Sequence, residues 1–311
     1  LDGRGAGARL YGMPHAPAPA TEPSQPASPG GTLALSKHEA AGNDFLVLVG
    51  TGETAPPSSA LVRAVCDRRR GVGADGLLVV RPWEGDADLD MVLYNADGSR
   101  AEMSGNGIRC LVHAAVMAGL ARTGPVRVRT DAGVRLVEYS ADGTLARASV
   151  DMGVVTLGDE VEPPVPGAHA RRADVGNPHV VVLLAAATDE SATTGLESLD
   201  LRTLAGKVTA MVGEPMNVEV VVPVGERALA LRVFERGVGE TAACGTGSCA
   251  AAAVAHELGL VDRVVTVESP GGALTVRLGE APGTPAVLSG PVRHVADVVV
   301  WPGALELAGR A

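Results

Sequence analysis

Short apolar runs, some continuous and some alternating with polar residues, recur along the chain and predict a structure dominated by β-strands. The runs are rich in Val and are separated by Gly, Pro and Asp, which are typical of turns. They predict strands over residues 45–49, 76–80, 126–130, 134–139, 180–184, 217–222, 228–234, 264–268 and 273–278. Helical spacing of apolar residues is less frequent and predicts helices over 58–67, 105–118, 199–205 and 245–258.

The two longest predicted helices are apolar on every side. Residues 250–253 are four consecutive alanines, and Gly119 and Gly259 supply matching stop signals after the two helices. A helix without a polar face has to be surrounded by protein. We therefore expect each of these helices to be central, with strands wrapped around it.

An internal similarity places the two helices at equivalent positions. A shift of 140 positions pairs Asn95 with Glu235 and Ser104 with Cys244, and a shift of 134 pairs the Gly-Asn at 42–43 with that at 176–177. Landmarks in the same order argue against chance and indicate a duplicated unit. The sequence predicts an α+β fold of two pseudo-symmetric halves, each a barrel-like sheet around a central helix.

The predicted boundaries follow from this similarity. Residues 1–32 are rich in Pro, Ala and Gly, have no apolar periodicity, and are expected to be a disordered extension. Residues 33–150 form the predicted N-terminal half and residues 151–311 the C-terminal half, whose last strand could pack back on the first half. A chain of 311 residues is long enough for two cores.

Composition and charge exclude several classes of protein. The formal net charge of -10 argues against nucleic-acid binding, because phosphate recognition needs a basic face. No apolar run approaches the ~20 residues that span a bilayer. Four cysteines without a C-x-x-C pair, and scattered histidines, predict reduced thiols, a cytoplasmic location and no metal site.

The residues at the start of the two central helices point to acid–base chemistry. The first turn of a helix has free N–H groups and a partial positive charge, so two facing helix starts could hold one carboxylate. Ser104 and Cys244 directly precede these turns and would flank the carbon attached to that carboxylate. The helix dipole is expected to lower the pKa of the Cys244 thiol. One group on each face of an α-carbon is what proton removal and return on the opposite face require.

Ordered motifs from about residue 33 to the C-terminus resemble the diaminopimelate epimerases, which are cofactor-independent amino acid epimerases. The resemblance implies a homodimer without a cofactor that interconverts LL- and meso-2,6-diaminopimelate for lysine and peptidoglycan precursor synthesis. The motifs that carry it are Lys37-His38, Gly42-Asn-Asp-Phe45, Gly71-Val-Gly-Ala-Asp-Gly76, Asn95-Ala-Asp-Gly-Ser99, Gly105-Asn-Gly107, Gly176-Asn-Pro-His179, Asn217-Val-Glu219, Glu235-Arg-Gly-Val-Gly-Glu-Thr241 and Ala243-Cys-Gly-Thr-Gly247.

The resemblance also implies roles for single residues. Cys244 would act on one face of the substrate α-carbon and the residue at position 104 on the other. Backbone N–H groups of Gly105, Asn106, Gly245 and Thr246 would hold the reacting carboxylate. The other substrate-binding residues that the resemblance implies are Asn43, Asn95, Asn177, Asn217, Glu235 and Arg236, with His179 in a supporting role.

Ser104 departs from the family, which has a cysteine at this position. A serine hydroxyl is scarcely ionised at neutral pH and cannot simply replace a thiolate, although it could pass on a proton or hold a water that does. Three interpretations are open: a natural epimerase with a modified one-thiol route, an engineered Cys to Ser change, and a paralogue. The paralogue could have altered isomerase activity, as in racemases of proline-like acids, or be a catalytically silent amino acid binder.

The remaining cysteines and histidines receive no functional role. Cys66 and Cys249 are expected to be small buried apolar groups, and Cys110 to lie inside the helix away from its start. His38, His113, His256 and His294 are expected at the surface or on helix faces.

Overall fold

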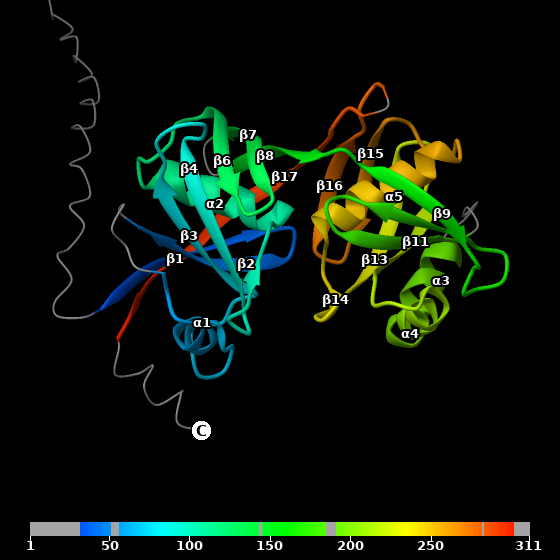
Figure 1. Ribbon diagram of the computed structural model, residues 1–311, viewed down its shortest axis with the longest axis horizontal. Coiled ribbons are helices and arrows are strands. Elements are labelled where there is room, and N and C mark those ends of the chain that lie inside the picture. The colour runs from blue at the N-terminus through cyan, green and yellow to red at the C-terminus, as the bar shows by residue number, and fades with distance from the viewer. Residues whose placement is uncertain (1–31, 51–55, 143–144, 185–190, 282, 302–311) are drawn as a thin grey trace, which may run out of the picture.

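The computed structural model describes residues 32–50, 56–142, 145–184, 191–281 and 283–301. The predicted extension, apart from residue 32, lies outside the described residues. Figure 1 shows two rounded halves side by side along the long axis, with a helix enclosed in each. Within the described ranges, no helix has the length and apolar character needed to cross a membrane.

The first half contains ten consecutive elements. They are β1 (Leu33–Ala40), β2 (Asn43–Val49), α1 (Ser59–Cys66), β3 (Gly76–Pro82), β4 (Leu89–Asn95), β5 (Arg100–Ala101), α2 (Gly105–Met117), β6 (Gly124–Thr130), β7 (Gly133–Asp142) and β8 (Leu145–Gly153).

The second half repeats this order after a linking strand, with two helices in place of α1. Its elements are β9 (Thr156–Val161), β10 (His169–Asp174), β11 (Pro178–Leu183), α3 (Ser191–Ser198), α4 (Leu201–Val212), β12 (Asn217–Pro223), β13 (Ala228–Glu235), β14 (Gly239–Thr241), α5 (Gly245–Glu257), β15 (Val264–Ser269), β16 (Gly272–Arg277) and β17 (Ala286–Val300).

Strands enclose both central helices. Around α2 the ring runs β1-β2-β3-β4-β6-β7-β8-β17 and closes by a second pairing of β17 with β1. Around α5 the order is β9-β10-β11-β12-β13-β15-β16-β17. Each half has two parallel strand pairs at matching places. They are β2–β3 and β4–β6 in the first half, and β11–β12 and β13–β15 in the second. The fold is the α+β arrangement that the sequence predicts.

Outer helices add a further layer to each half. The apolar face of α1 packs with Leu46 and Leu77 of the adjacent strands, and α4 packs with Val180 and Val218. Strands β3 and β12 are consequently buried on both faces, which explains their nearly continuous apolar sequences. Strand β6 instead alternates buried and exposed residues, because only one of its faces meets the core.

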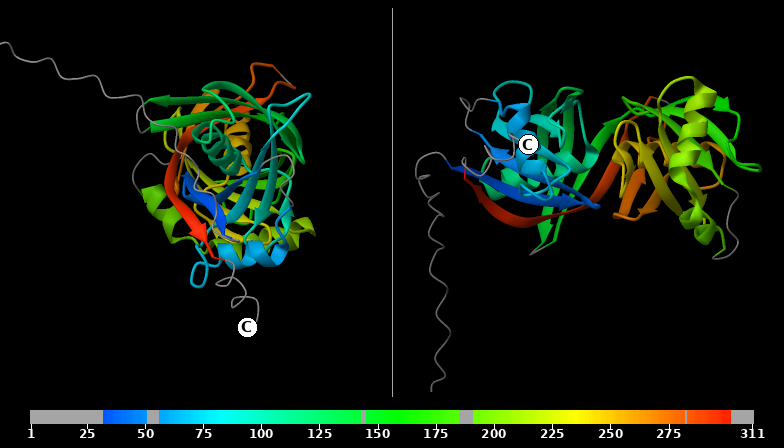
Figure 2. Two further views of the ribbon diagram at one scale, coloured as in Figure 1. Left: turned by 90° about the vertical axis from the view of Figure 1, so that its left-hand side faces the viewer. Right: turned by 90° about the horizontal axis from the view of Figure 1, so that it is seen from below.

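Strand β17 belongs to both halves. It is 15 residues long. Its first part pairs with β16, and its last part pairs with β1 as far as Val300 opposite Leu33. From Ala286 to Val292, which includes the part paired with β16, it also runs antiparallel to β8, the strand that leaves the first half. Figure 2 shows the red end of β17 alongside the blue β1. The two halves are thus joined by hydrogen-bonded strands as well as by the chain.

The nine predicted strands are confirmed as β2, β3, β6, β7, β11, β12, β13, β15 and β16, and the predicted helices as α1, α2, α4 and α5. The helix predicted over 199–205 is longer and ends at Val212. No residue range was predicted for β1, β4, β5, β8, β9, β10, β14, β17 or α3, although a last strand was expected that could pack back on the first half. Strands β8 and β10 carry Ala and Arg in place of Val, and β17 contains Gly290 and Pro291, so their local signal is weak.

One histidine lies elsewhere than expected. His38 is fully buried on β1, whereas the sequence suggested the surface or a helix face; His113 lies on α2 and is 9% exposed. Their rings pack edge to face, 5.1 Å apart between centroids, and His294 lies 5.2 Å from His38. The burial arises because β1, α2 and β17 meet inside the first half, a contact that no local pattern reveals.

Candidate active site

The starts of α2 and α5 have the same local geometry. Ser104 and Cys244 are N-cap residues with extended backbones, at φ -141° and ψ 123° and at φ -129° and ψ 120°. Ser104 Oγ accepts a hydrogen bond from Gly107 N at 3.0 Å, and Cys244 Sγ accepts one from Gly247 N at 3.4 Å. Each side chain therefore lies against the first turn of its helix, as N-caps do.

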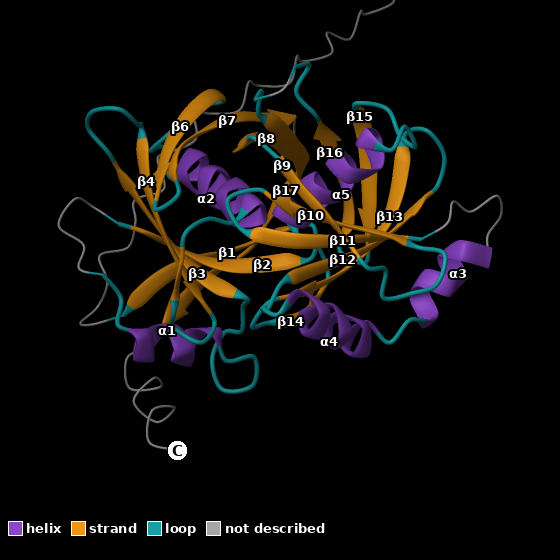
Figure 3. Cartoon of the chain, turned by 45° about the vertical axis from the view of Figure 1, so that its right-hand side comes forward, coloured by secondary structure: helices purple, strands orange, loops and turns teal. Residues whose placement is uncertain are grey.

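The two helix starts meet. Figure 3 shows α2 and α5 converging on the middle of the molecule. A Cβ built on Gly245 would lie 3.4 Å from the Cα of Gly105. Leu288 of β17 packs against both glycines. A Cβ built on Gly245 would lie 2.8 Å from Leu288 Cδ2, and a Cβ built on Gly105 would lie 3.0 Å from the same atom. Glycine at these positions permits the close approach. The free N–H groups of both first turns are consequently brought to one place.

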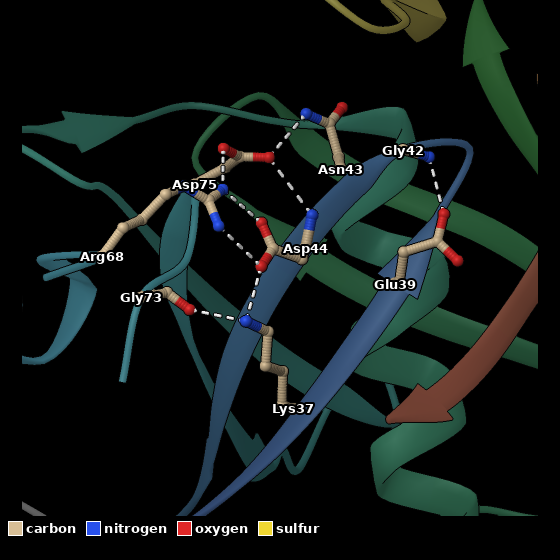
Figure 4. Close-up of polar contacts among 8 residues, drawn as sticks. All are labelled: Lys37, Glu39, Gly42, Asn43, Asp44, Arg68, Gly73 and Asp75. Atoms are coloured by element: carbon tan, nitrogen blue, oxygen red, sulfur yellow. Dashed lines mark hydrogen bonds and ion pairs between the residues drawn. The ribbon is translucent and has the colours of Figure 1, made fainter. Parts of the chain in front are cut away.

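A hydrogen-bonded network supports the first of these helix starts. The Asn106 side-chain amide donates to Asn43 Oδ1, and Asn43 Nδ2 donates to Asp75 Oδ2 at 3.1 Å. Asp75 also accepts from the backbone N–H of Asp44 at 3.2 Å. The network thus fixes Asn106, which is 1% exposed, to the edge of β2. Figure 4 shows Asn43 and Asp75 in this arrangement.

Ion pairs hold the outer end of this network. Arg68 donates to Asp44 and Asp75 at 2.6 and 2.7 Å, and Lys37 Nζ lies 2.7 Å from both Asp44 and the carbonyl of Gly73 (Figure 4). Burial alone would raise the pKa of Asp44, but the hydrogen bonds from Arg68 and Lys37 outweigh it and hold that pKa below its usual range. The network is therefore anchored by a permanently charged group.

A different set of side chains surrounds the second helix start. Cys244 Sγ lies 3.4 Å from Thr246 Oγ1, to which Asn177 Nδ2 donates at 3.4 Å. His179 Nε2 is 2.9 Å from Asn177 Oδ1, and its Nδ1 is 2.7 Å from Glu219 Oε1. Because Asn177 Oδ1 can only accept, His179 Nε2 donates to it, while Nδ1 is within hydrogen-bond distance of Glu219. The imidazole is thereby held in one orientation.

The pKa of the Cys244 thiol is raised, contrary to the expectation from the helix dipole. Burial is the largest cause, followed by the negative charges of Glu235 and Glu219. These effects outweigh hydrogen bonds from Thr246 and the Gly247 N–H, which favour the thiolate. The thiol is 6% exposed and is protonated at neutral pH in the ligand-free protein. Burial depends on the tertiary fold, so the local helix-end argument did not capture it.

Glu235 lies beside the thiol. It accepts a hydrogen bond from Thr241 Oγ1. Burial raises its pKa, against the opposing hydrogen bonds from Thr241 and the Cys244 thiol. Glu235 can therefore take up a proton next to Cys244 more readily than an exposed glutamate could.

The other predicted residues occupy the neighbouring strand ends. Asn217 is opposite His179 in the β11–β12 ladder, and its Oδ1 accepts from the backbone N–H of Arg236 at 2.9 Å. The Arg236 residue itself is exposed. Asn95 is also exposed and bonds within its own turn, to Ser99 Oγ at 3.0 Å. Contacts thus link Asn177, His179 and Thr246 to Cys244, while Asn95 makes its contact away from that cluster.

Sequence reasoning assigned no role to three residues that the structure places in these networks. Glu219 is fully buried on β12 with Oε2 unpartnered, and Arg109 is fully buried on α2. Asp75 links Asn43 to Arg68. Glu219 and Arg109 are single charged residues inside otherwise apolar runs, and that is the signal that could have identified them. Among the described residues, no group of His, Cys, Asp and Glu could hold a metal ion.

Relatives with known names share this chain's sequence. The family model described as Diaminopimelate epimerase matches residues 35–158 and 172–295, one region in each half. A diaminopimelate epimerase of Desulforudis audaxviator (strain MP104C) is 36% identical over 284 residues, covering 85% of this chain and 98% of that protein. Another, of Azoarcus sp. (strain BH72), is 37% identical over 291 residues, covering 88% and 99%.

Solved structures share the fold at low sequence identity. A PhzF-family phenazine biosynthesis protein of Bacillus anthracis has a TM-score of 0.68 at 16% identity, with 87% of this chain and 99% of that chain covered. A hydroxyproline epimerase from Agrobacterium vitis has a TM-score of 0.66 at 15% identity, covering 87% and 93%. These similarities establish the two-half fold alone. The resemblance found in the motifs is confirmed by the family model and the relatives: the chain belongs to the diaminopimelate epimerase family and is an isomerase of that type.

Proposed function

We propose that this protein converts LL-2,6-diaminopimelate into the meso form by proton removal and return at the α-carbon, between Cys244 and the residue-104 side. The observation that carries the proposal is the meeting of two helix starts at Gly105 and Gly245, each capped by a side chain that can exchange a proton. Backbone N–H groups of these first turns, including Asn106 and Thr246, would hold the reacting carboxylate.

The second amino acid head of the substrate would be bound by the surrounding polar residues. Glu235 could pair with an ammonium, and the exposed Arg236 offers a planar fork for a carboxylate. The amides of Asn95, Asn177 and Asn217 supply donors and acceptors for this head, and Asn43 is a further residue of the pocket. A substrate with only one amino acid head would leave these groups unused, which favours diaminopimelate over proline-like acids.

The proton transfers have to start from a protonated thiol. Cys244 becomes a base when its proton moves to solvent or to Glu235, whose raised pKa favours taking up that proton. The thiolate then takes the α-proton as the C–H bond breaks. On the opposite face the neutral Ser104 hydroxyl, or a water that it holds, donates a proton to the carbon, and solvent neutralises the resulting oxygen anion. His179 would support this reaction by keeping Asn177 and Thr246 in place beside the thiol.

Deuterium exchange tests the proposal. In D2O, each diaminopimelate isomer is incubated with the protein, and deuterium at the α-carbon and the isomer ratio are measured. Incorporation with inversion is expected. Incorporation without inversion would indicate that Cys244 acts alone on one face, and no incorporation would indicate a silent binder, the alternative that Ser104 raises. The family also leads us to propose a cytoplasmic homodimer that binds no nucleic acid, and light scattering would measure the dimer mass.

A further inference from the structure

Arg109 is a buried charge without an ion-pair partner among the described residues, although the negative charge of Glu39 acts on it from a greater distance. It is the largest of the fully buried side chains, on a helix whose other buried residues carry no charge except for the titratable His113. Its Nε has no hydrogen-bond partner, and no carboxylate of the described residues forms an ion pair with it. Burying an unpaired charge costs several kcal/mol or more. A residue this costly requires a physical reason.

The guanidinium points back to the start of α2. Nη1 donates to the carbonyl of Gly105 at 3.1 Å, and Nη2 donates to Asn106 Oδ1 at 2.8 Å. These are the two residues whose backbone N–H groups form the first turn of the helix. By taking the Asn106 oxygen, Arg109 also directs the amide nitrogen of Asn106 towards Asn43. The side chain therefore fixes the geometry of the first turn and adds positive charge behind it.

The second half has no copy of this arginine. The shift of 140 positions places Arg109 on Cys249, which is fully buried at the same depth in α5. The guanidinium lies where elements of the two halves pack together: a Cβ built on Gly290 of β17 would be 3.3 Å from Arg109 Cζ and 2.5 Å from Leu274 Cδ2. A single cation is thus enclosed near the junction of the two helix starts. A single buried cation at this place is consistent with one anion shared by both helix starts, whereas two separate anion sites would call for a cation in each half.

The charge persists at neutral pH. Burial lowers the pKa of Arg109 to about 10, which still leaves the guanidinium protonated at pH 7. Its positive charge also opposes the effect of burial on the Cys249 thiol, whose pKa burial raises to about 12. The cation is therefore felt across the junction, in the second half as well as in the first.

We propose that Arg109 is a positioning residue and the buried counter-charge of an anionic ligand, a carboxylate, held between the starts of α2 and α5. It acts through Gly105 and Asn106 without touching the ligand. The inference takes the carboxylate class from the proposed function. When an α-proton leaves an amino acid carboxylate, the negative charge on the two oxygens increases, so a fixed cation behind them favours that state over the ground state.

Three variants at position 109 separate charge from shape. Arg109→Met has similar length and no charge, Arg109→Gln retains a donor for Asn106 without charge, and Arg109→Lys retains the charge. Arg81→Met is the matched control, because Arg81 is paired with Asp90 at 2.6 Å on β3 and lies outside the proposed site. For each protein the melting temperature is measured alone and with meso-diaminopimelate, acetate, or 1,5-diaminopentane, which lacks both carboxylates.

The charge role predicts a distinct pattern. Wild type is stabilised by both carboxylates and not by 1,5-diaminopentane. Arg109→Met and Arg109→Gln bind the carboxylates about 10- to 100-fold more weakly, while Arg109→Lys loses less than about 10-fold. In turnover, kcat falls more than KM rises in the uncharged variants, because the interaction strengthens as charge develops. Arg81→Met changes the melting temperature of the free protein and leaves the ligand-induced shift intact.

Other patterns would overturn the inference. If Arg109→Lys and Arg109→Gln bind carboxylates equally well, the charge is irrelevant and the arginine is structural. The same conclusion holds if Arg109→Met lowers the melting temperature of the free protein but keeps the full ligand-induced shift. If Arg109→Met fails to fold, the comparison of Arg109→Lys with Arg109→Gln decides between the two roles. Wild type that responds to acetate but not to diaminopimelate would contradict the proposed substrate alone, whereas wild type that responds to neither carboxylate would contradict the inference.

Discussion

The starts of α2 and α5 are alike in backbone and unlike in chemistry. Both helices have 13 residues, both N-cap side chains accept from the N–H three residues on, and both are followed by a left-handed glycine, Gly119 at φ 74° and Gly259 at φ 71°. Around Ser104 the support consists of amides anchored by Arg68 and Lys37. Around Cys244 it consists of Thr246 and the carboxylates of Glu235 and Glu219.

The difference teaches how the work is divided between the halves. Repeated backbone geometry, with glycine at the first helical position of each half, supplies the two sets of N–H groups that can hold one anion, and Arg109 adds charge behind one of them. Proton exchange depends on side chains and their charges, and of the two helix starts the one at α5 has a thiol with an adjacent carboxylate. Substitutions that make the starts of α2 and α5 more alike, or less alike, therefore test this division of roles.

Exchanging the capping residues is expected to have the largest effect. Cys244→Ser leaves a hydroxyl at both ends and should reduce deuterium incorporation by about 1,000-fold or more, because no thiolate remains. Ser104→Cys supplies a second thiol and should raise epimerisation by about 100-fold, the usual scale of a general acid or base. Both are measured as initial rates of isomer conversion in D2O.

Cys66→Ser controls for the loss of a buried thiol. Cys66 lies on α1 at 3% exposure, and replacing it should lower stability without changing kcat. If Ser104→Cys leaves the rate unchanged, residue 104 does not take part in the rate-limiting transfer. If Cys244→Ser keeps exchange at the wild-type rate, the assignment of the base is wrong.

Acid should destabilise the first half more than the second. Burial, reinforced by His113 and His294, lowers the pKa of His38 from 6.5 to about 3. Between these values the unfolded chain binds a proton that the folded chain excludes, so stability falls as pH falls through this window, by up to a few kcal/mol. His38→Gln should flatten the dependence of the unfolding free energy between pH 6.5 and 4.

Urea unfolding followed by tryptophan fluorescence measures this effect, because Trp83 and Trp301 both adjoin strands of the first half. His256→Gln, on α5, serves as the control and should retain the wild-type dependence on pH. A slope in His38→Gln that equals the wild-type slope would show that the buried ring is not the group responsible.

The glycines inside the two first turns should respond unequally. A Cβ on Gly247 would lie 2.5 Å from Glu219 Oε1, which His179 holds in place, so Gly247→Ala should cost about 1–3 kcal/mol. A Cβ on Gly107 would lie 3.1 Å from Ser104 Cβ. There the gain of about 0.5–1 kcal/mol from alanine in a helix offsets the crowding. Calorimetry that found equal losses would mean that the two turns are packed alike.

The extent to which the sequence predicted the fold depended on local signal strength. Val-rich strands such as β12 and the glycine-flanked α2 and α5 were found, and so was the duplication, which rests on landmarks far apart in the chain. No residue ranges were predicted for β8 and β17, because Ala, Arg, Gly and Pro residues weaken their local signal and the two strands are defined by pairing with each other. Such pairing is a tertiary property that no local window contains.

The site divides in the same way. The positions of Ser104 and Cys244 followed from the helix-start pattern, while Thr246, Asn177 and His179 came from the motif resemblance. The raised pKa of Cys244 and the network partners Asp75, Glu219 and Arg109 could not be predicted, because burial and contacts across strands determine them. A lone charged residue in an apolar run is the one local clue that deserved more weight.

The path of β17 has a consequence for biosynthesis. Because the last strand closes the ring around α2, the half made first by the ribosome cannot finish folding until nearly the whole chain has been translated. The nascent protein must meanwhile carry the unpaired edges of β1 and β8, which invite aggregation. The N-terminal half is therefore the first to be synthesised, but it completes its fold only after the C-terminal half has been made.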